Sequence, residues 1–187
     1  MELSLLMLDK IYLHCPTDRM LEYLNGMNAA FQEFEINSIN RMAAWLGQVG
    51  VESGELRYTE EVWGPSPQQA RYEPPSSLAM RLGNTKKGDG YLFRGRGPIE
   101  LTGRSNYARV GKALGVDLEG NPDLAATPDV MFRVAGYYWK THGCNELADN
   151  CNFDAITQKI NGGLTDNDRR WLYYRLALAV LTANPND

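Results

Sequence analysis

Histidine and cysteine are scarce in this chain, which has only two histidines and three cysteines. His14 and His142 lack neighbouring ligands at metal-binding spacing, and the cysteines do not form the paired motifs of a zinc site. The sequence therefore supports neither a metal centre nor a serine or cysteine nucleophile activated by histidine.

Long apolar runs and an excess of positive charge are also absent. No run approaches the ~18 apolar residues of a membrane-spanning helix, and residues 1–8 include Glu2, unlike a signal peptide. The formal net charge is -4 and the pI is about 5.3, whereas general nucleic-acid binders show a basic face. We expect neither membrane insertion nor a nucleic-acid partner.

The overall composition is that of a folded globular protein. Hydrophobic residues make up 43% and charged residues 22% of the 187 residues, which are ordinary values for this class. This length fits one domain with a substantial core, and no internal repeat or low-complexity tract interrupts it. We expect residues 1–187 to form a single domain.

Helical periodicity covers much of the chain. Apolar residues recur at helical spacing over residues 18–34, with Thr17 as the predicted N-cap. A second helix is predicted from Ser38, with Glu52 on its last turn and Gly54 as the stop signal. Further helices are predicted over residues 105–114, 128–142, 153–160 and 168–181, and a frayed tail over residues 185–187.

Glycine and proline punctuate the middle of the chain. Residues 62–90 carry turn chemistry with little periodicity, which predicts a long surface loop that overhangs a cleft. Residues 91–101 alternate weakly around Gly and Pro positions, which predicts a short hairpin or an extended strand. The predicted fold class is therefore mainly α, formally α+β, with one small β element.

Two of the cysteines, Cys144 and Cys151, bracket a short polar stretch. In an oxidising compartment a disulfide between them would close this stretch. The alternative is two reduced thiols in a loop, with Cys15 as a small unpaired hydrophobe. The sequence leaves both states open.

Three short blocks carry the functional signal: Val51-Glu52-Ser53-Gly54, Gly95-Arg96-Gly97-Pro98-Ile99-Glu100-Leu101-Thr102-Gly103-Arg104, and Ile160-Asn161-Gly162-Gly163. Taken singly they fit an acidic helix end, a tight turn and the turn after a helix, and no phosphate-loop or dinucleotide pattern accompanies the glycines. Taken together and in this order, they resemble glycoside hydrolase family 19, whose members cleave β-1,4 bonds in N-acetylhexosamine polymers. The resemblance spans residues 39–179 and implies a lysozyme-like helical fold with a substrate cleft.

This resemblance implies that Glu52 is the general acid and Glu61 the general base, with Glu60 as a rival for the second role. Inverting hydrolysis needs one protonated and one ionised carboxyl group about 6.5–9.5 Å apart. On an unbroken helix, nine residues would separate the two by about 13.5 Å on opposite faces. Gly54 removes this difficulty, because glycine adopts backbone conformations that let the chain fold back.

By the same resemblance Thr102 holds the attacking water, a role that suits a hydroxyl because it both donates and accepts. Two residues depart from the family pattern. Val51 replaces the usual His before the acid, and Glu100 replaces the usual Gln. Glu100 then either keeps the acid protonated by like-charge repulsion or forms an ion pair with Arg94, Arg96 or Arg104, and we favour the ion pair.

The resemblance also implies sugar contacts by Glu100, Asn106, Asn161 and Arg169, because amides supply both donors and acceptors to N-acetyl sugars. Without the resemblance, Asn161 is part of a turn at a helix end and Arg169 is a surface charge. Most of the tryptophans are expected in the core, but Trp63 lies in the Gly/Pro-rich loop beside Glu61, where aromatic faces stack on sugars.

Within the family, the compact domain, the short Glu52–Glu61 spacing and the lack of a chitin-binding module resemble bacteriophage endolysins. The resemblance thus implies a monomeric lysozyme-like enzyme that cleaves peptidoglycan without metal or cofactor. With no visible signal peptide, it would be made in the cytoplasm and reach the cell wall or periplasm through a holin or a secretion system. Two alternatives stay open: a chitinase acting on chitin oligomers, and a chitinase-like protein that binds glycan without turnover.

Overall fold

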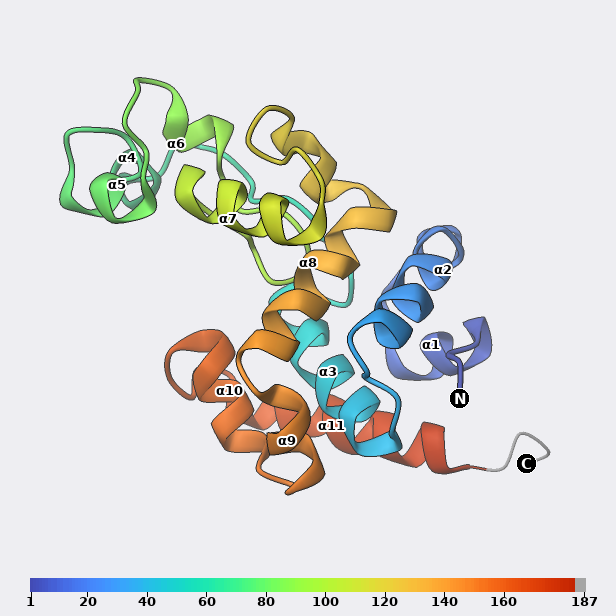
Figure 1. The fold of residues 1–187 in the computed structure, drawn as a ribbon. Coiled ribbons are helices and arrows are strands. Elements are labelled where there is room, and N and C mark those ends of the chain that lie inside the picture. Colours follow the sequence, from blue (N-terminus) through green and yellow to red (C-terminus); the bar gives the residue numbers. More distant parts are fainter. Residues whose placement is uncertain (184–187) are drawn as a thin grey trace.

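Helix α3 (Ile39–Glu52) runs through the centre of the molecule and ends at the predicted acid (Figure 1). The computed structural model describes residues 1–183, so the predicted tail at residues 185–187 lies outside the described residues. Ser38 caps α3 as predicted, since its hydroxyl accepts a hydrogen bond from the backbone N–H of Arg41 at 3.2 Å. The helix packs most extensively against α11 (Asn167–Thr182) and also contacts α9 (Cys144–Asp149) and α10 (Phe153–Asn161).

Small residues on α3 explain how closely α11 approaches it. A Cβ atom placed on Gly47 would lie 3.0 Å from Cβ of Tyr174 on α11, so a larger residue there would force the helices apart. The C-terminal helix is thereby held against the helix that ends at Glu52. This contact fixes the position of the α3 C-terminus relative to the side chains of α11.

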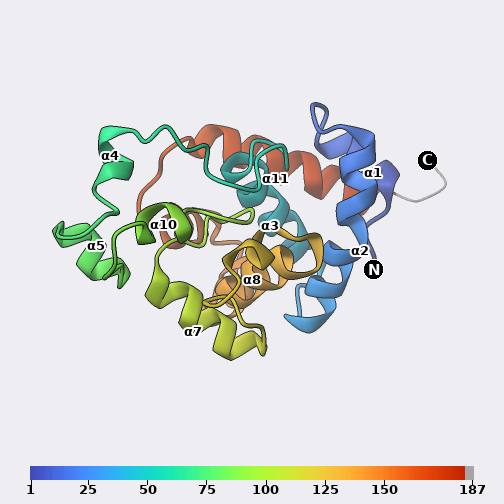
Figure 2. The same ribbon diagram turned by 90° about the horizontal axis from the view of Figure 1, so that it is seen from above.

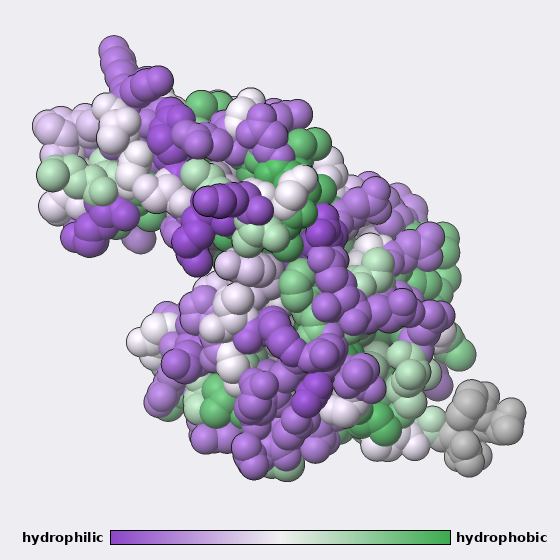
Figure 3. Space-filling model, in the orientation of Figure 1, coloured by the Kyte–Doolittle hydropathy of each residue, from purple (hydrophilic) through white to green (hydrophobic). Residues whose placement is uncertain are grey.

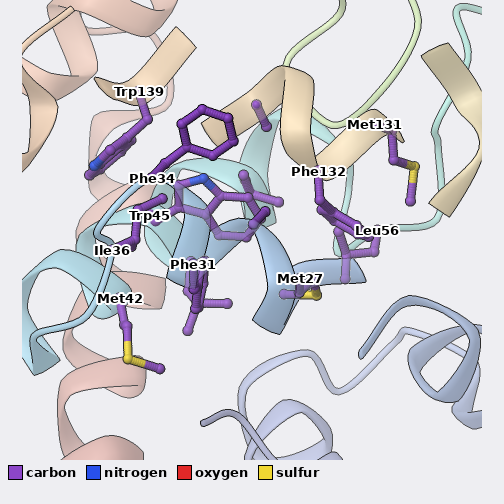
Figure 4. Packing of buried hydrophobic residues seen from close by; sticks show 14 of the residues in the cluster. Met27, Phe31, Phe34, Ile36, Met42, Trp45, Leu56, Met131, Phe132 and Trp139 are labelled. Atoms are coloured by element: carbon purple, nitrogen blue, oxygen red, sulfur yellow. The ribbon is translucent and has the colours of Figure 1, made fainter. Parts of the chain in front are cut away.

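The remaining long helices cover the other side of α3. Helix α2 (Thr17–Glu33) packs on α8 (Pro128–Thr141), and the shorter α1 (Leu5–Ile11) contacts both α2 and α11. Trp45 of α3 occupies the middle of the apolar cluster between them (Figure 4), with its ring centroid 5.0 Å from that of Phe31 and 6.1 Å from that of Phe132. A single contiguous core therefore joins the N-terminal helices to the central ones.

The segment predicted as a long loop contains short helices. They are α4 (Pro67–Ala70), α5 (Ser77–Leu82) and α6 (Asp89–Leu92), followed by α7 (Arg104–Leu114). Buried polar side chains order this region: the Asp89 carboxylate accepts hydrogen bonds from the backbone N–H groups of Thr85 and Lys86 and from the Arg104 guanidinium. Such long-range polar contacts leave no periodic signal in the sequence, which is why the segment resembled a loop.

The predicted β element is present in its smallest form. Arg96 and Leu101 exchange both backbone hydrogen bonds, at 3.1 and 2.8 Å, around a turn of Gly97 to Glu100. Arg96 also forms a bridge with Glu60. Within residues 1–183 these are isolated bridges rather than a sheet, so the fold is mainly helical, as predicted.

Besides α4 to α6, three further elements were not predicted: α1, α9 and the 3-10 helix Pro122–Ala126. Helix α9 forms in the polar stretch between Cys144 and Cys151, where Asn145 bridges two distant groups by accepting from the Trp139 indole and donating to the Phe34 carbonyl. Cys144 is buried and Cys151 is exposed, and both thiols, like that of Cys15, are free. Burial raises the pKa of the Cys144 thiol to about 12.

The molecule has two parts with a hollow between them. In the view of Figure 3 the surface is hollowed between the part built from α4 to α7 and the part built from α9 to α11. The view from above shows α8 and α3 behind this opening, with α1 and α2 on the far side (Figure 2). Across residues 1–183, no helix is long and apolar enough to cross a membrane.

Candidate active site

A sharp turn follows α3 directly after Glu52. Three consecutive residues, Gly54, Glu55 and Leu56, have positive φ values of 56°, 64° and 63°. Left-handed backbone is unusual for residues other than glycine. The prediction that the chain folds back at Gly54 is confirmed, but Glu55 and Leu56 adopt the left-handed conformation as well. The turn ends the helix and sends the chain back towards the segment that carries Glu61.

The Glu55 side chain anchors this turn. Its buried carboxylate accepts hydrogen bonds from the backbone N–H of His14 at 2.6 Å and from the Tyr173 hydroxyl at 2.5 Å, and it lies 2.8 Å from Nδ1 of His14. Burial opposes ionisation of Glu55, but these hydrogen bonds outweigh it and lower its pKa. The strained turn is thus fixed both by the segment before α2 and by α11.

Glu52, the last residue of α3, is held by a buried arginine. Nη2 of Arg170 lies 2.5 Å from Oε1 of Glu52, while Nη1 of the same guanidinium donates to Oε1 of Gln48 at 2.7 Å. Gln48 in turn donates to the Thr157 hydroxyl at 2.8 Å. Among residues 1–183, Oε2 of Glu52 has no hydrogen-bond partner, so one carboxylate oxygen is fixed and the other is available to a ligand.

Glu61 is held in a way that suits an ionised carboxylate. Its Oε2 accepts a hydrogen bond from the Gly95 backbone N–H at 3.0 Å, and its Oε1 accepts one from the Gln69 side chain at 3.0 Å. Gln69 is itself locked, because its carbonyl oxygen accepts from the backbone N–H groups of Gly64 and Ser66. The two donors fix the orientation of the Glu61 carboxylate, and a general base must be positioned in this way.

Glu60, the rival candidate base, is engaged elsewhere. Its carboxylate forms ion pairs with Arg94 and with Arg96, the latter with Nε at 3.0 Å. Arg96 is buried and also pairs with Asp123 at 2.6 Å. Since Glu60 already compensates a buried guanidinium, these contacts favour Glu61 as the base.

Gly95 brings the proposed base and the water-holding residue together. A Cβ atom placed on Gly95 would lie 3.2 Å from Cβ of Glu100, 3.4 Å from Cβ of Glu61 and 3.4 Å from Oγ1 of Thr102. These three side chains therefore surround one position that only glycine leaves open. The Thr102 hydroxyl donates to the Glu100 carbonyl at 2.8 Å, which leaves its lone pairs free to accept from water.

The sequence and the fold of this chain are both similar to those of known proteins. The model of glycoside hydrolase family 19, described as chitinase class I, matches residues 36–169. A family 19 domain protein of Haemophilus influenzae is 38% identical over 167 residues, covering 76% of this chain and 82% of the relative. The chain belongs to glycoside hydrolase family 19. It is therefore a glycosidase. The matched residues include the predicted catalytic residues Glu52, Glu61 and Thr102.

Plant enzymes and crystal structures extend the comparison. An endochitinase of Arabidopsis thaliana is 36% identical over 129 residues, and an acidic endochitinase of Petunia hybrida is 37% identical over 135 residues. The chain spans 41% and 52% of their lengths, about half of each. Chitinase C of Streptomyces griseus has the same fold, with a TM-score of 0.72 at 21% identity, covering 97% of this chain and 77% of that one.

Glu100 is the second of the two departures of this family 19 chain from the family pattern, and the ion pair predicted for it is wrong. The three arginines in question pair with other carboxylates: Arg94 and Arg96 with Glu60, and Arg104 with Asp89 and Glu119. The Glu100 side chain is exposed at the cleft, yet the protein around its carboxyl group raises its pKa by partial burial. The negative charges of Glu61 and Glu52 raise this pKa further. Three carboxylates thus act on one another across one site.

Replacing Glu100 with glutamine is expected to raise the free energy of unfolding at neutral pH. A raised pKa means that the ionised form is disfavoured in the folded state, so stability is lost as the pH rises from the ordinary glutamate pKa of 4.5 through the folded pKa. Denaturant unfolding at several pH values tests this.

Both limbs of the pH–rate profile of Glu100→Gln should also move to lower pH, because one negative charge is gone. Superimposable profiles for Glu100→Gln and the unsubstituted enzyme would contradict the coupling.

The other predicted sugar contacts lie in different surroundings. Asn106, on the first turns of α7, donates to the Thr102 carbonyl at 2.8 Å and so supports the backbone of the water-holding residue. Asn161 is the exposed last residue of α10. Arg169 is exposed and lies beside Tyr173. The sugar-binding roles of these residues stay predictions.

Sequence reasoning missed several residues of the site. Arg170, one position beyond the predicted Arg169, makes the contact with Glu52, and Gln69 holds Glu61. The helical spacing of α11 could have indicated Arg170, because this residue shares the buried face of the helix with Tyr174 and Ala177, whereas Arg169 does not. Tyr72 was missed as well; burial raises its pKa, and the charges of Glu61 and Glu100 raise it further.

Trp63 lies in an aromatic group beside this site, as its place next to Glu61 predicted. Its ring centroid is 5.5 Å from that of Tyr91 in an edge-to-face arrangement and 6.2 Å from that of Tyr72. The group adds aromatic faces, of the kind that stack on sugar rings, to the α4–α6 part of the cleft.

No group of three or more His, Cys, Asp or Glu side chains within residues 1–183 is placed to hold a metal ion. The site itself offers the carboxylates of Glu52, Glu61 and Glu100, the Thr102 hydroxyl and the Gln69 amide. Paired carboxylates that share one cleft, one fixed by an arginine and one by neutral donors, suit acid and base roles towards a glycosidic bond.

Proposed function

We propose that this chain is an endolysin-like lysozyme that hydrolyses β-1,4 bonds of peptidoglycan glycan strands with inversion of configuration. The observation that carries the proposal is the arrangement around Gly95. Glu61, Thr102 and Glu100 lie together there, and the charges of Glu61 and Glu52 both raise the pKa of Glu100. That arrangement supplies the acid, the base and the water ligand that single displacement requires. The chain would act on the wall as a monomer, without a cofactor.

In the proposed reaction Glu52 donates its proton to the glycosidic oxygen as the bond from that oxygen to the anomeric carbon breaks. Glu61 accepts a proton from a water molecule held with Thr102, and the water oxygen bonds to the anomeric carbon from the opposite face. The leaving sugar departs with a free hydroxyl. Afterwards Glu52 is ionised and Glu61 protonated, and exchange with solvent resets both groups.

The role of Arg170 is to orient Glu52. Because the guanidinium is fixed by Gln48 and by the Thr165 carbonyl, it holds Oε1 and directs the remaining oxygen of Glu52 to the substrate. Glu100 lies in the same site, and burial together with the charges of Glu61 and Glu52 raises its pKa.

Peptidoglycan is the preferred substrate because the nine-residue spacing from Glu52 to Glu61 resembles that of phage endolysins. Reaching the wall would need a holin or a secretion system. Chitin is the second candidate, favoured by the 36–37% identity to those endochitinases.

Digestion of purified sacculi, with the fragments identified by mass, tests the proposal. We expect muropeptides with new reducing ends at β-1,4 bonds, and the first-formed sugar observed by NMR should have the α configuration, since inversion converts a β bond. Chitin oligomers are the parallel substrate. Turnover of chitin alone would move the function to a chitinase, and a β product would exclude inversion.

A further inference from the structure

A cavity of about 200 Å³ opens beside the predicted water-holding residue, between α7 and α8. Thr102, Glu100 and Asn106 form its side nearest the catalytic carboxylates. Its floor is apolar and includes Val110 of α7 and Val134 of α8. The cavity therefore adjoins the site at Thr102 and Glu100 and extends between α7 and α8.

The opposite wall is aromatic and rigid. The rings of Tyr138 and His142 stack with centroids 3.7 Å apart, and the Tyr138 hydroxyl donates to the Lys159 carbonyl at 2.6 Å. Tyr137 and Thr141 complete this wall on α8. Fixed walls on both helices mean that the space is preformed.

Arg109 supplies positive charge at the rim of the cavity. It is exposed and lies one turn beyond Asn106 on α7. Its Nη2 donates a hydrogen bond to Oδ1 of Asn106 at 3.1 Å. Throughout residues 1–183 it forms no ion pair, unlike Arg94, Arg104 and Arg170 around the cleft, whose guanidinium groups are all paired with carboxylates. Arg109 is thus available to an anion that enters the cavity.

The size of the cavity limits what it accepts. At about 200 Å³ it has room for several water molecules, and hence for a branch on a sugar ring. An apolar floor with a cationic rim suits a short branch that carries methyl groups and a carboxylate. A plain N-acetylglucosamine unit offers no such group.

We propose that this cavity binds the lactyl-peptide branch of N-acetylmuramic acid, with the Arg109 guanidinium paired to a carboxylate of that branch. The inference rests on the proposed peptidoglycan function and specifies how the site would distinguish the two polymers. Chitin is uncharged, whereas the muramic acid branch presents the planar carboxylate that a guanidinium binds through two parallel hydrogen bonds. Arg109 is accordingly a substrate-binding residue.

Binding of soluble muramyl dipeptide, measured by NMR titration, tests this inference with Arg109→Gln. Loss of a charge-assisted pair should weaken binding roughly 10- to 100-fold, and Arg109→Lys should recover part of it. Lys112→Gln is the matched control, because Lys112 is an exposed cation on the same helix that does not line the cavity. A muramyl dipeptide with its carboxylates converted to amides should bind Arg109→Gln and the unsubstituted protein equally.

The same proteins are then assayed on sacculi, which separates the two proposals. If the unsubstituted protein cleaves sacculi but Arg109→Gln binds muramyl dipeptide as tightly as Lys112→Gln does, the cavity inference is wrong and the proposed function stands. If the unsubstituted protein leaves sacculi intact, the proposed function fails and this inference fails with it.

Discussion

Replacing Glu52 with glutamine is expected to lower the turnover number on the glycan substrate by roughly 10²- to 10⁴-fold, the usual contribution of a positioned general acid. Glutamine keeps the shape of the side chain and its hydrogen bond with Arg170, but it has no proton to give to the glycosidic oxygen. Initial rates of reducing-end release measure the effect. Thermal unfolding of the same variant shows whether the fold survives.

Matched variants on neighbouring glutamates sharpen this expectation. Glu61→Gln should be about as impaired, because its amide cannot accept the proton of water. Glu60→Gln tests the rival base, and Glu22→Gln is the neutral control, since Glu22 is exposed on α2 far along the chain from the site. Full activity of Glu52→Gln would exclude it as the acid. An inactive Glu60→Gln beside an active Glu61→Gln would transfer the base role to Glu60.

The second large effect is expected for Arg170, whose side chain is only 2% exposed. Arg170→Gln should lower the free energy of unfolding by about 3–5 kcal/mol, because it leaves the Glu52 charge and the Gln48 carbonyl without their partner in a largely buried site. Denaturant unfolding measures this loss. Turnover should fall as well, since Glu52 is no longer oriented.

A double-mutant cycle identifies the source of that loss. Adding Glu52→Gln to Arg170→Gln removes the uncompensated charge, so the double variant should be more stable than the sum of the two single effects predicts. Arg175→Gln is the control, being an exposed arginine on the same helix. Strict additivity would mean that the buried pair contributes nothing beyond packing.

The long helices were predictable from sequence because their apolar periodicity is the same signal that makes them pack. The bounds of α3 follow from Ser38, which caps it, and from Gly54, whose left-handed backbone ends it. The extension of that backbone to Glu55 and Leu56 was not predictable, since these residues adopt it only because His14 and Tyr173 hold the Glu55 carboxylate. A local pattern does not contain partners 41 and 118 positions away.

The site shows the same division between local and long-range information. One short turn in the block from Gly95 to Arg104 carries Thr102 and Glu100, and both lie with Glu61 around Gly95, while their catalytic and sugar-binding roles stay predictions. The ion pair predicted for Glu100 was wrong, because neighbouring arginines were closer in sequence but found better partners in space, such as Asp89 for Arg104. Arg170 and Gln69 escaped notice for the complementary reason: their functional contacts join segments 118 and 8 residues apart without any motif.

The anchoring of Glu55 bears on where this catalytic unit begins and ends. The stretch matched by the family model runs from residue 36 to residue 169, yet His14 lies before it, while Arg170 and Tyr173 lie after it. A protein trimmed to the matched stretch would lose His14 and Tyr173, which hold the Glu55 carboxylate, along with the guanidinium that orients Glu52. Any truncated or transplanted version of this enzyme therefore needs both flanking arms.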